Sequence, residues 1–420
     1  NRSCRLSMRV AHICPILPAR HGNGLAMRTS MFAEAAAGLG EALIVVIGSH
    51  QGPVPDHDIS GASIAGIDGL SRPDTKLMLI SKHATPDQRP DLLRQYGRPS
   101  ASVMLSLPVM QETVNRLQQH QPDVIVISRS YLLPLVDPLK TAFPNVPVIA
   151  DLDDDDGELH RSYAVQTCPP DNRAERRWHE AEADMADSQI TSAARDVAMF
   201  TCASDLVANG LQQRLRLDSV RVVRNAVPDR DPFHKPGSAN GELLFLGNLS
   251  YWPNIDGLQW FLTGVWPDLQ LQFPDIRLVV AGSNPDAAVR QMCSGNNVEL
   301  VADPDHVAPL YQRAAATVVP LRLGSGSRIK ILEAGQYGTA VITTDKGSEG
   351  LKLDAEKHAF VCATRTDEML AACIDCLSDR QLAQQRADAL QSFVRQHHDR
   401  KAIIGEIRSL MRDTLTAPAT

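Results

Sequence analysis

Residues 318–338 read VVPLRLGSGSRIKILEAGQYG. A β-branched run ends at Pro320, a loop of glycine and serine follows over residues 324–326, and a helical pattern begins near Ser327. A strand, a glycine-containing loop and a helix in this order are typical of doubly wound α/β domains, whose ligands bind beyond the carboxyl ends of the parallel strands. We therefore expect a ligand site at this loop.

The charges at the start of this helix indicate that the ligand is an anion. Glycines in the loop let the backbone approach a ligand closely, and Ser327 is a candidate N-cap. Arg328 and Lys330 lie in the first helical turn, where the helix dipole disfavours cations. A phosphate bound to the free N–H groups of the helix start removes this conflict, because both side chains then neutralise it. We therefore predict a phosphate site at Arg328 and Lys330.

Glu333 follows Lys330 by three residues, so the two side chains share a helix face. A carboxylate in this place can accept hydrogen bonds from two vicinal hydroxyls, such as those of a ribose. An ordinary surface ion pair between Lys330 and Glu333 is the alternative. The glycine loop, the cations and the acid together favour the ligand site.

Short β-branched runs alternate with helical patterns along the whole chain, which predicts two doubly wound α/β domains with parallel sheets. We expect strands at residues 8–14, 42–48, 123–128, 146–150, 197–202 and 220–224, and again at 242–246, 276–281, 297–301, 316–320, 340–344 and 358–362. We expect helices at 25–39, 108–120, 255–271, 286–293, 306–314, 327–337 and 367–377, with a helical segment over 380–415. The default ligand site of such a pair is a cleft between the two sheets.

The alternation breaks at residues 228–241, PDRDPFHKPGSANG, which is the best linker candidate. We predict an N-terminal domain over residues 1–232, a linker over 233–241, a C-terminal domain over 242–395, and a last helix over 396–420 that packs back on the first domain.

Composition excludes several classes of protein. The chain has 420 residues, and 42 Lys and Arg against 49 Asp and Glu give a net charge of -7, so nucleic-acid binding is not expected. No apolar run approaches the roughly 18 residues that span a bilayer, and the N-terminus carries no signal-peptide pattern. The eight cysteines are scattered and several stand in apolar runs, which predicts buried, reduced thiols in a cytoplasmic protein.

Metal binding is not expected. Cys373 and Cys376 form the only close cysteine pair, without a second pair to complete a zinc site. The acidic run at residues 151–156, DLDDDD, is interpreted as a solvated turn. Trp252 is the tryptophan most suited to stack on a sugar, whereas Trp260 and Trp266 stand in an apolar helix and are assigned to the core.

Four segments together resemble the retaining family-4, or group 1, glycosyltransferases. They are residues 247–261 (GNLSYWPNIDGLQWF), 278–285 (LVVAGSNP), 298–311 (VELVADPDHVAPLY) and 320–351 (PLRLGSGSRIKILEAGQYGTAVITTDKGSEGL). The resemblance is strongest over residues 241–351 and weaker at residues 15–28 (PILPARHGNGLAMR) and 221–228 (RVVRNAVP). It implies the GT-B fold, in which two Rossmann-like domains face a central cleft and the C-terminal domain holds a nucleotide-sugar.

The resemblance also implies roles for individual residues. Glu333 matches the acid that binds the nucleotide ribose, and Arg328 and Lys330 resemble a basic pair that stabilises the departing diphosphate. The other donor-binding candidates are Gly324, Ser325, Gly326, Ser327, Gly247, Asp303, His306 and Val307. The acceptor-side candidates of the first domain are Gly22, Gly24, His21 and Arg129.

Three departures separate this chain from many family members. The first acid of their pair is replaced by Ser325, and the Arg and Lys that they carry early in the second domain are missing from residues 247–256. Their N-terminal histidine has no match, since Arg129, Ser130 and Tyr131 follow the strand at 123–128.

The sequence and the resemblance lead us to expect a retaining, metal-independent glycosyltransferase without a cofactor. It would take a nucleoside-diphosphate sugar and an acceptor that carries a hydroxyl group, such as a glycan, a glycolipid precursor or a small molecule. The alternatives left open are a non-catalytic nucleotide-, glycan- or partner-binding protein and sugar-nucleotide epimerisation. Any membrane contact is expected to be peripheral, at the inner face, and the donor, the linkage and the oligomeric state stay open.

Overall fold

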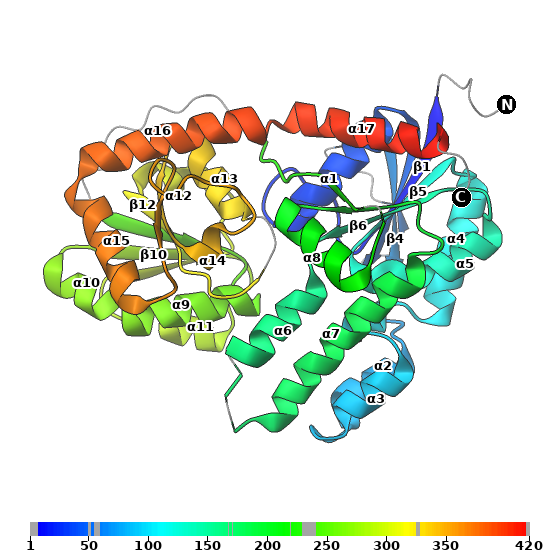
Figure 1. Cartoon of the computed structure of the whole chain (residues 1–420), viewed down its shortest axis with the longest axis horizontal. Helices are drawn as coiled ribbons and strands as arrows, with labels where there is room; N and C mark the ends of the chain where they lie inside the picture. Colours follow the sequence, from blue (N-terminus) through cyan, green and yellow to red (C-terminus); the bar gives the residue numbers. More distant parts are fainter. Residues whose placement is uncertain are drawn as a thin grey trace. The chain divides into compact units, whose positions relative to one another are not determined.

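The computed structural model of the chain describes residues 7–48, 52–53, 59–166, 168–169, 171–218, 220–228, 241–324 and 328–416 (Figure 1). The chain forms two compact units. The first contains Asn1–Asn225 and Arg400–Thr420, and the second contains Ala226–Asp399. The domain limits at 232, 242 and 395 stay predictions, and most of the expected linker lies outside the described residues.

The first unit is built on an eight-stranded sheet in the order β3-β4-β2-β1-β5-β6-β7-β8. Its strands are β1 (Met8–Cys14), β2 (Gly40–Gly48), β3 (Gly52–Pro53), β4 (Ala62–Asp68), β5 (Val124–Ser128), β6 (Val148–Asp153), β7 (Met199–Cys202) and β8 (Val220–Val222). β3 pairs antiparallel with β4, and the other neighbouring strands are parallel. All five residues of the central strand β5 are buried, as expected for a sheet covered on both faces.

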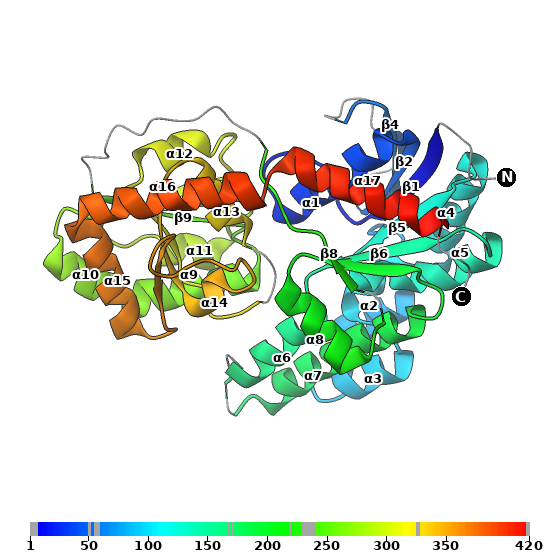
Figure 2. The ribbon, with the colours of Figure 1, turned by 45° about the horizontal axis from the view of Figure 1, so that its top comes forward.

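Helices cover both faces of this sheet (Figure 2). They are α1 (Gly24–Ala37), α2 (Thr75–His83), α3 (Arg89–Tyr96), α4 (Leu107–His120), α5 (Val136–Ala142), α6 (Asp156–Gln166), α7 (Arg173–Ala193), α8 (Asp205–Leu215) and α17 (Arg400–Thr416), with 3₁₀ helices η1 (Ser100–Met104) and η2 (Ser130–Leu135). Helix α1 begins after Asn23, whose side chain accepts a hydrogen bond from the Leu25 N–H. The sequence pattern predicted no helix or strand within residues 49–105, yet these residues form β4, α2 and α3.

The last helix, α17, packs along α1 (Figures 1 and 2). Arg400 fixes it there, because its guanidinium donates to Ser30 Oγ at 2.7 Å and to Glu34 Oε1 at 2.8 Å. The chain therefore returns to its first unit after completing the second.

The second unit holds a six-stranded parallel sheet in the order β11-β10-β9-β12-β13-β14. Its strands are β9 (Glu242–Leu246), β10 (Arg277–Gly282), β11 (Val298–Ala302), β12 (Ala316–Val319), β13 (Ala340–Thr344) and β14 (Phe360–Cys362). Its helices are α9 (Trp252–Gly264), α10 (Trp266–Gln272), α11 (Ala287–Met292), α12 (Ala308–Arg313), α13 (Ile329–Gln336), α14 (Asp345–Ser348), α15 (Thr366–Ser378) and α16 (Arg380–His397). The predicted fold class, two doubly wound α/β sheets, is confirmed.

Two predicted helices are each interrupted. The helix expected over 255–271 is divided into α9 and α10 at Val265, because Pro267 occupies the first turn of α10 and has no N–H to continue α9. The segment over 380–415 divides into α16 and α17. Trp252, the tryptophan proposed to stack on a sugar, is the first residue of α9, and Trp266 is buried in the core as predicted.

The interpretation of residues 151–156 as a solvated turn is wrong. Asp151 and Asp155 are buried, and β6 runs through Asp151 to Asp153. Arg28 pairs with Asp151 at 2.7 Å, and Arg214 pairs with Asp155 at 2.8 Å. These arginines are far from the acids in the sequence, so no local sequence pattern indicates the ion pairs.

Two further predictions concern the chain as a whole. The seven described cysteines, all except Cys4, are free and buried, as expected for reduced thiols. Among the described residues, no helix is long and apolar enough to cross a membrane.

Replacing Glu182 with glutamine should stabilise the first unit at alkaline pH. The pKa of Glu182 on α7 is raised to about 7, mainly because the side chain is buried. The nearby Asp156 also raises this pKa, whereas hydrogen bonds from Ser100, including one from its N–H, lower it. Because the folded-state pKa exceeds the unfolded value, the native state binds extra protons, and stability falls as pH rises through about 4.5 to 7. Glu182→Gln removes this loss. Urea unfolding should therefore show that the variant's free energy of unfolding exceeds that of the wild type by on the order of 2–3 kcal/mol at pH 8, and that this difference disappears below pH 4.5.

Glu180→Gln is the matched control, because Glu180 is exposed on the same helix. It should leave the free energy of unfolding almost unchanged at both pH values. A Glu182→Gln protein that is less stable than the wild type at pH 8 would contradict the assignment of a buried, costly charge.

Candidate functional site

The candidate site lies at the carboxyl edge of the second unit's sheet. β9 is the first strand of this sheet, and its two neighbours, β10 and β12, continue the chain in opposite directions across the sheet. The strand order therefore reverses between β9 and β12, and ligands of open α/β sheets bind outside the carboxyl ends of the strands at such a point. Gly247 follows β9, and the loop to α13 follows β12.

Arg328 is the N-cap residue of α13 and lies buried against the loop that precedes it. Its Nη2 donates to the Gly324 carbonyl at 2.6 Å and to the Lys346 carbonyl at 3.3 Å. The Arg328 Nε is also buried and has no hydrogen-bond partner among the described residues. Arg328 therefore fixes the end of the glycine loop and keeps one buried donor that an anion could satisfy.

Lys330 lies on the first turn of α13, and its amine points to the end of β9. The Nζ donates to Asn254 Oδ1 at 2.7 Å and lies 5.4 Å from the centre of the Phe245 ring. Burial lowers the pKa of Lys330 to about 7, the neighbouring Arg328 lowers it further, and Glu333 acts in the opposite direction. An anion arriving here would favour the charged ammonium and draw a proton onto Lys330.

Glu333 is buried one turn further along α13. Its Oε2 accepts a hydrogen bond from the Tyr311 hydroxyl at 3.3 Å, and the Tyr311 ring stacks on Tyr337 at 4.6 Å between centroids. A carboxylate has two oxygens that can each accept more than one hydrogen bond, so hydroxyl groups of a ligand are suitable donors to Glu333. Arg328, Lys330 and Glu333 thus follow one another along a single helix start, as the sequence predicted.

The remaining donor-side candidates are distributed around the same edge. Gly247 directly follows β9, and Gly324 has a φ of +97°, a conformation that favours glycine. Asp303 is exposed and accepts a hydrogen bond from the Asn284 N–H at 2.8 Å. His306 is exposed, and Val307 caps α12, the helix that carries Tyr311.

Ser325, Gly326 and Ser327 lie outside the described residues. Their predicted contacts with the donor stay predictions. The predicted N-cap role of Ser327 is wrong, because α13 begins at Ile329 and Arg328 holds the N-cap position.

The acceptor-side candidates belong to the first unit and flank its own switch point between β1 and β5. His21 and Gly22 precede α1, Gly24 is its first residue, and Gly22 has a φ of +90°. Arg129 follows β5 with a φ of +81°, a strained conformation for a residue other than glycine. Its guanidinium pairs with Asp156 and, at 3.5 Å, with Asp153. Arg129 is therefore a positioned but already paired cation.

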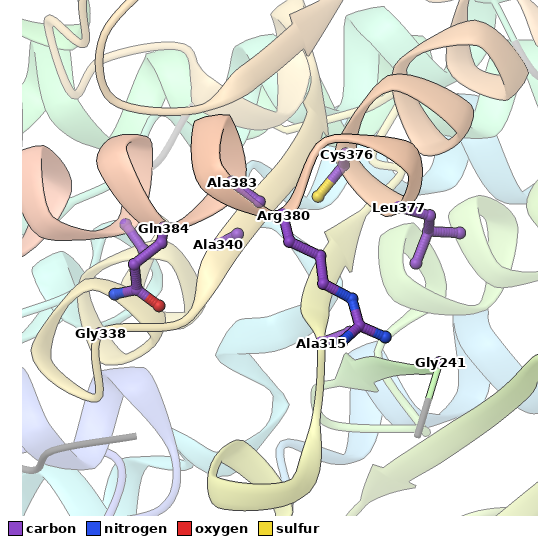
Figure 3. A pocket seen from close by; sticks show the side chains of 10 residues that line it. Gly241, Ala315, Gly338, Ala340, Cys376, Leu377, Arg380, Ala383 and Gln384 are labelled. Atoms are coloured by element: carbon purple, nitrogen blue, oxygen red, sulfur yellow. The ribbon is translucent and has the colours of Figure 1, made fainter. Parts of the chain in front are cut away.

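A surface cavity of the second unit lies at the opposite edge of its sheet (Figure 3). It is lined by residues at the amino ends of the strands, including Gly241, Ala315 and Ala340, and by Arg380 at the start of α16. Arg328, Lys330 and Glu333 are not among its lining residues, so this cavity is separate from the candidate site. Among the described residues, no group of three or more His, Cys, Asp or Glu side chains could hold a metal ion.

The structure adds two side chains that the sequence analysis did not assign to the site. Asn254 and Tyr311 contact Lys330 and Glu333, although each stands about twenty or more residues away in the sequence. Asn254 reaches Lys330 because β9, which leads to α9, pairs with β12, which leads to α13. Tyr311 lies on α12, on the other side of β12 in the chain, so local helix spacing does not group it with Glu333.

A family model and a curated relative both match part of the chain. Residues 240–379 match the family described as glycosyl transferases group 1. An uncharacterized 44.6 kDa protein in the cps region of Klebsiella pneumoniae is 26% identical over 178 residues, which make up 40% of this chain and 45% of that protein. The aligned region thus spans less than half of this relative.

Solved structures match over nearly the whole chain. The sucrose-phosphate synthase of Thermosynechococcus elongatus has a TM-score of 0.72 at 14% identity, covering 98% of this chain and all of that one. HepE of Anabaena in complex with UDP and glucose has a TM-score of 0.64 at 14% identity, covering 97% and 100%. A TarM mutant of S. aureus in complex with fondaparinux, alpha-GlcNAc-glycerol and UDP has a TM-score of 0.66 at 8% identity, covering 98% and 100%. This likeness shows that the chain has the GT-B fold.

Proposed function

Because residues 240–379 match the group 1 glycosyltransferases, we propose that the chain transfers a sugar from a nucleoside-diphosphate donor to a hydroxyl acceptor with retention of configuration. The observation that carries this proposal is the arrangement of Arg328, Lys330 and Glu333 on one helix start at the switch point of the second sheet. The complexes of HepE with UDP and of TarM with UDP support a nucleoside diphosphate as the ligand.

The proposed chemistry depends on stabilising the leaving group. The bond from the anomeric carbon to the diphosphate breaks, and the charge that develops on the phosphate oxygen is neutralised by Arg328 and Lys330. The N–H groups at the start of α13 add a partial positive charge. The acceptor hydroxyl attacks from the face that the diphosphate leaves, and a phosphate oxygen takes the hydroxyl proton.

Glu333 is proposed to bind the ribose of the donor, and Asp303, His306 and Val307 to flank its base. Gly247, Gly324, Ser325, Gly326 and Ser327 would lie along the diphosphate and the sugar. In the first unit Gly22, Gly24, His21 and Arg129 are proposed to contact the acceptor. A cytoplasmic location is proposed as well, since the described cysteines are free thiols.

Transfer is proposed to need no bound metal, because Arg328 and Lys330 lie together at the start of α13, where the diphosphate is proposed to bind. A chelator should then leave the initial rate unchanged, whereas a loss of rate that Mg²⁺ or Mn²⁺ restores would contradict this part of the proposal.

The direct test of the proposed function is a panel of UDP-, GDP- and dTDP-sugars, incubated with the protein and analysed for free nucleoside diphosphate and for transferred or isomerised sugar. We expect one donor to be hydrolysed slowly without an acceptor and to raise the melting temperature by mass action. Binding without turnover would support the non-catalytic alternative, and an isomerised donor would support epimerisation.

Glu333→Ala should abolish the distinction between ribose and 2′-deoxyribose. In the wild type the buried carboxylate is expected to bind both ribose hydroxyls, and a hydrogen bond to a charged group contributes about 1.5–3 kcal/mol, or roughly 10–100-fold in affinity. Calorimetric titration with a nucleoside diphosphate and its 2′-deoxy analogue measures this preference. The same preference in wild type and Glu333→Ala would exclude Glu333 as the ribose ligand.

A further inference from the structure

Asn254 is held rigidly beside the candidate diphosphate site. It lies on the first turn of α9 and is 6% exposed. Its Oδ1 accepts from Lys330 Nζ at 2.7 Å, and its Nδ2 donates to the Asn248 carbonyl at 2.9 Å. If the Asn254 amide were rotated by half a turn, its Nδ2 would face the Lys330 amine and its Oδ1 would face the Asn248 carbonyl, and neither hydrogen bond could form. The two contacts therefore fix the direction of the Oδ1.

Gly247 makes room for this arrangement. A Cβ at position 247 would lie 2.8 Å from Asn254 Nδ2 and 3.2 Å from Lys330 Nζ, closer than ordinary side-chain contacts allow. The missing side chain thus lets the amide and the amine meet directly at the end of β9.

We propose that Asn254 is a positioning residue, which holds the Lys330 amine at the switch point so that it meets the diphosphate of the donor. This inference rests on the proposed function for the identity of the anion. An amide suits the task, because it accepts a hydrogen bond from the ammonium without cancelling its charge. A carboxylate at the same place would hold the amine equally well and would compete with the phosphate for that charge.

The other charges around Lys330 are already accounted for. On its own helix, Arg328 and Glu333 act in opposite directions on its pKa. The charge on α9, Asp256, pairs with Arg322. The charge on β9, Glu242, lies at the opposite end of that strand and pairs with Arg313 at 2.9 Å. On α12 the hydroxyl of Tyr311 lies 3.4 Å from the Lys330 carbonyl. Asn254 is therefore the neutral partner whose replacement changes the environment of the amine most directly.

The test measures the Lys330 amine itself. Competitive acylation across a pH series, followed by peptide mass spectrometry, gives the apparent pKa of Lys330 without any donor sugar. From a value of about 7 in the wild type, Asn254→Asp should raise it by at least about one unit, because a carboxylate favours the ammonium. Asn254→Leu, which removes the acceptor and excludes water, should lower it. The exposed Gln259 of the same helix supplies the control Gln259→Ala, which should leave it unchanged.

Opposite shifts of the Lys330 pKa in the two variants would support the positioning role. A general loss of structure would instead shift this pKa in the same direction in both variants. Equal pKa values of Lys330 in wild type, Asn254→Asp and Asn254→Leu would overturn it.

The kinetic experiment uses the UDP-, GDP- and dTDP-sugar panel. There Asn254→Asp should lower kcat at least about tenfold with a smaller change in KM, because the charge is needed most as the diphosphate leaves. If the wild type turns over none of these donors, the proposed function fails, while the acylation result still decides the role of Asn254.

Discussion

Lys330→Ala is expected to lower turnover of the donor sugar by at least about a hundredfold, the effect of removing a charge-stabilising group from a transition state. The amine lies at the carboxyl end of β9, held by Asn254 and close to Arg328 on the same helix turn. Charge that develops on the leaving diphosphate would meet a preorganised cation there. Steady-state kinetics with the donor identified from the panel measures the effect on kcat.

Arg328→Ala is expected to be similarly impaired, because it removes both the buried Nε and the bonds to the loop carbonyls. Lys357→Ala provides the matched control. Lys357 is an exposed lysine of the same unit, paired with Asp354 at 2.9 Å, and its loss should leave turnover within about twofold. Wild-type turnover in both Lys330→Ala and Arg328→Ala would remove the catalytic assignment. Thermal unfolding of each variant separates a lost charge from a lost fold.

Arg28→Met should destabilise the first unit by about 3–5 kcal/mol, the usual result of leaving a buried charge without its partner. Arg28 and Asp151 are fully buried and paired through 2.7 and 2.9 Å contacts. Arg28 also donates to the Val223 carbonyl and to Asn225 Oδ1, both at 2.8 Å. One guanidinium thus connects α1, β6 and the segment after β8. Its loss leaves the Asp151 carboxylate in the core without a cation, although Thr201 Oγ1 still donates to it at 2.7 Å.

Urea unfolding followed by circular dichroism gives the loss of stability, with Arg195→Met as the control. Arg195 is exposed and pairs with its neighbour Asp196, so its removal should change stability by less than about 0.5 kcal/mol. Asp151→Leu added to Arg28→Met should recover part of the loss, because an apolar pair avoids the unpaired charge. Equal stability of Arg28→Met and the wild type would show that the pair contributes nothing.

Much of the fold could be predicted from the pattern of short apolar runs. The strands expected at 8–14, 242–246 and 340–344 coincide with β1, β9 and β13, because buried parallel strands show uninterrupted β-branched runs. The region that forms β4, α2 and α3 gave no such signal. The polar helix α3 is stabilised by its contacts with α7, which the sequence alone does not reveal.

The candidate site was predictable where its parts are consecutive in the chain. Arg328, Lys330 and Glu333 stand on one helix, so local spacing sufficed to group them. Asn254 and Tyr311 were missed because they lie on other helices, 76 and 22 residues away in the sequence from the Lys330 and Glu333 side chains that they contact. The buried acids at 151 and 155 were misinterpreted for the same reason, since their arginine partners come from α1 and α8.

The most direct test of a diphosphate at the start of α13 is calorimetric titration of the wild type, Arg328→Ala and Lys330→Ala with UDP, GDP, dTDP and the matching monophosphates. We predict that the wild type binds one diphosphate at least about tenfold more tightly than its monophosphate, since the second phosphate adds charge-assisted hydrogen bonds. Both variants should lose this preference and keep their affinity for the monophosphate. A preference that persists unchanged in both variants would contradict the central claim.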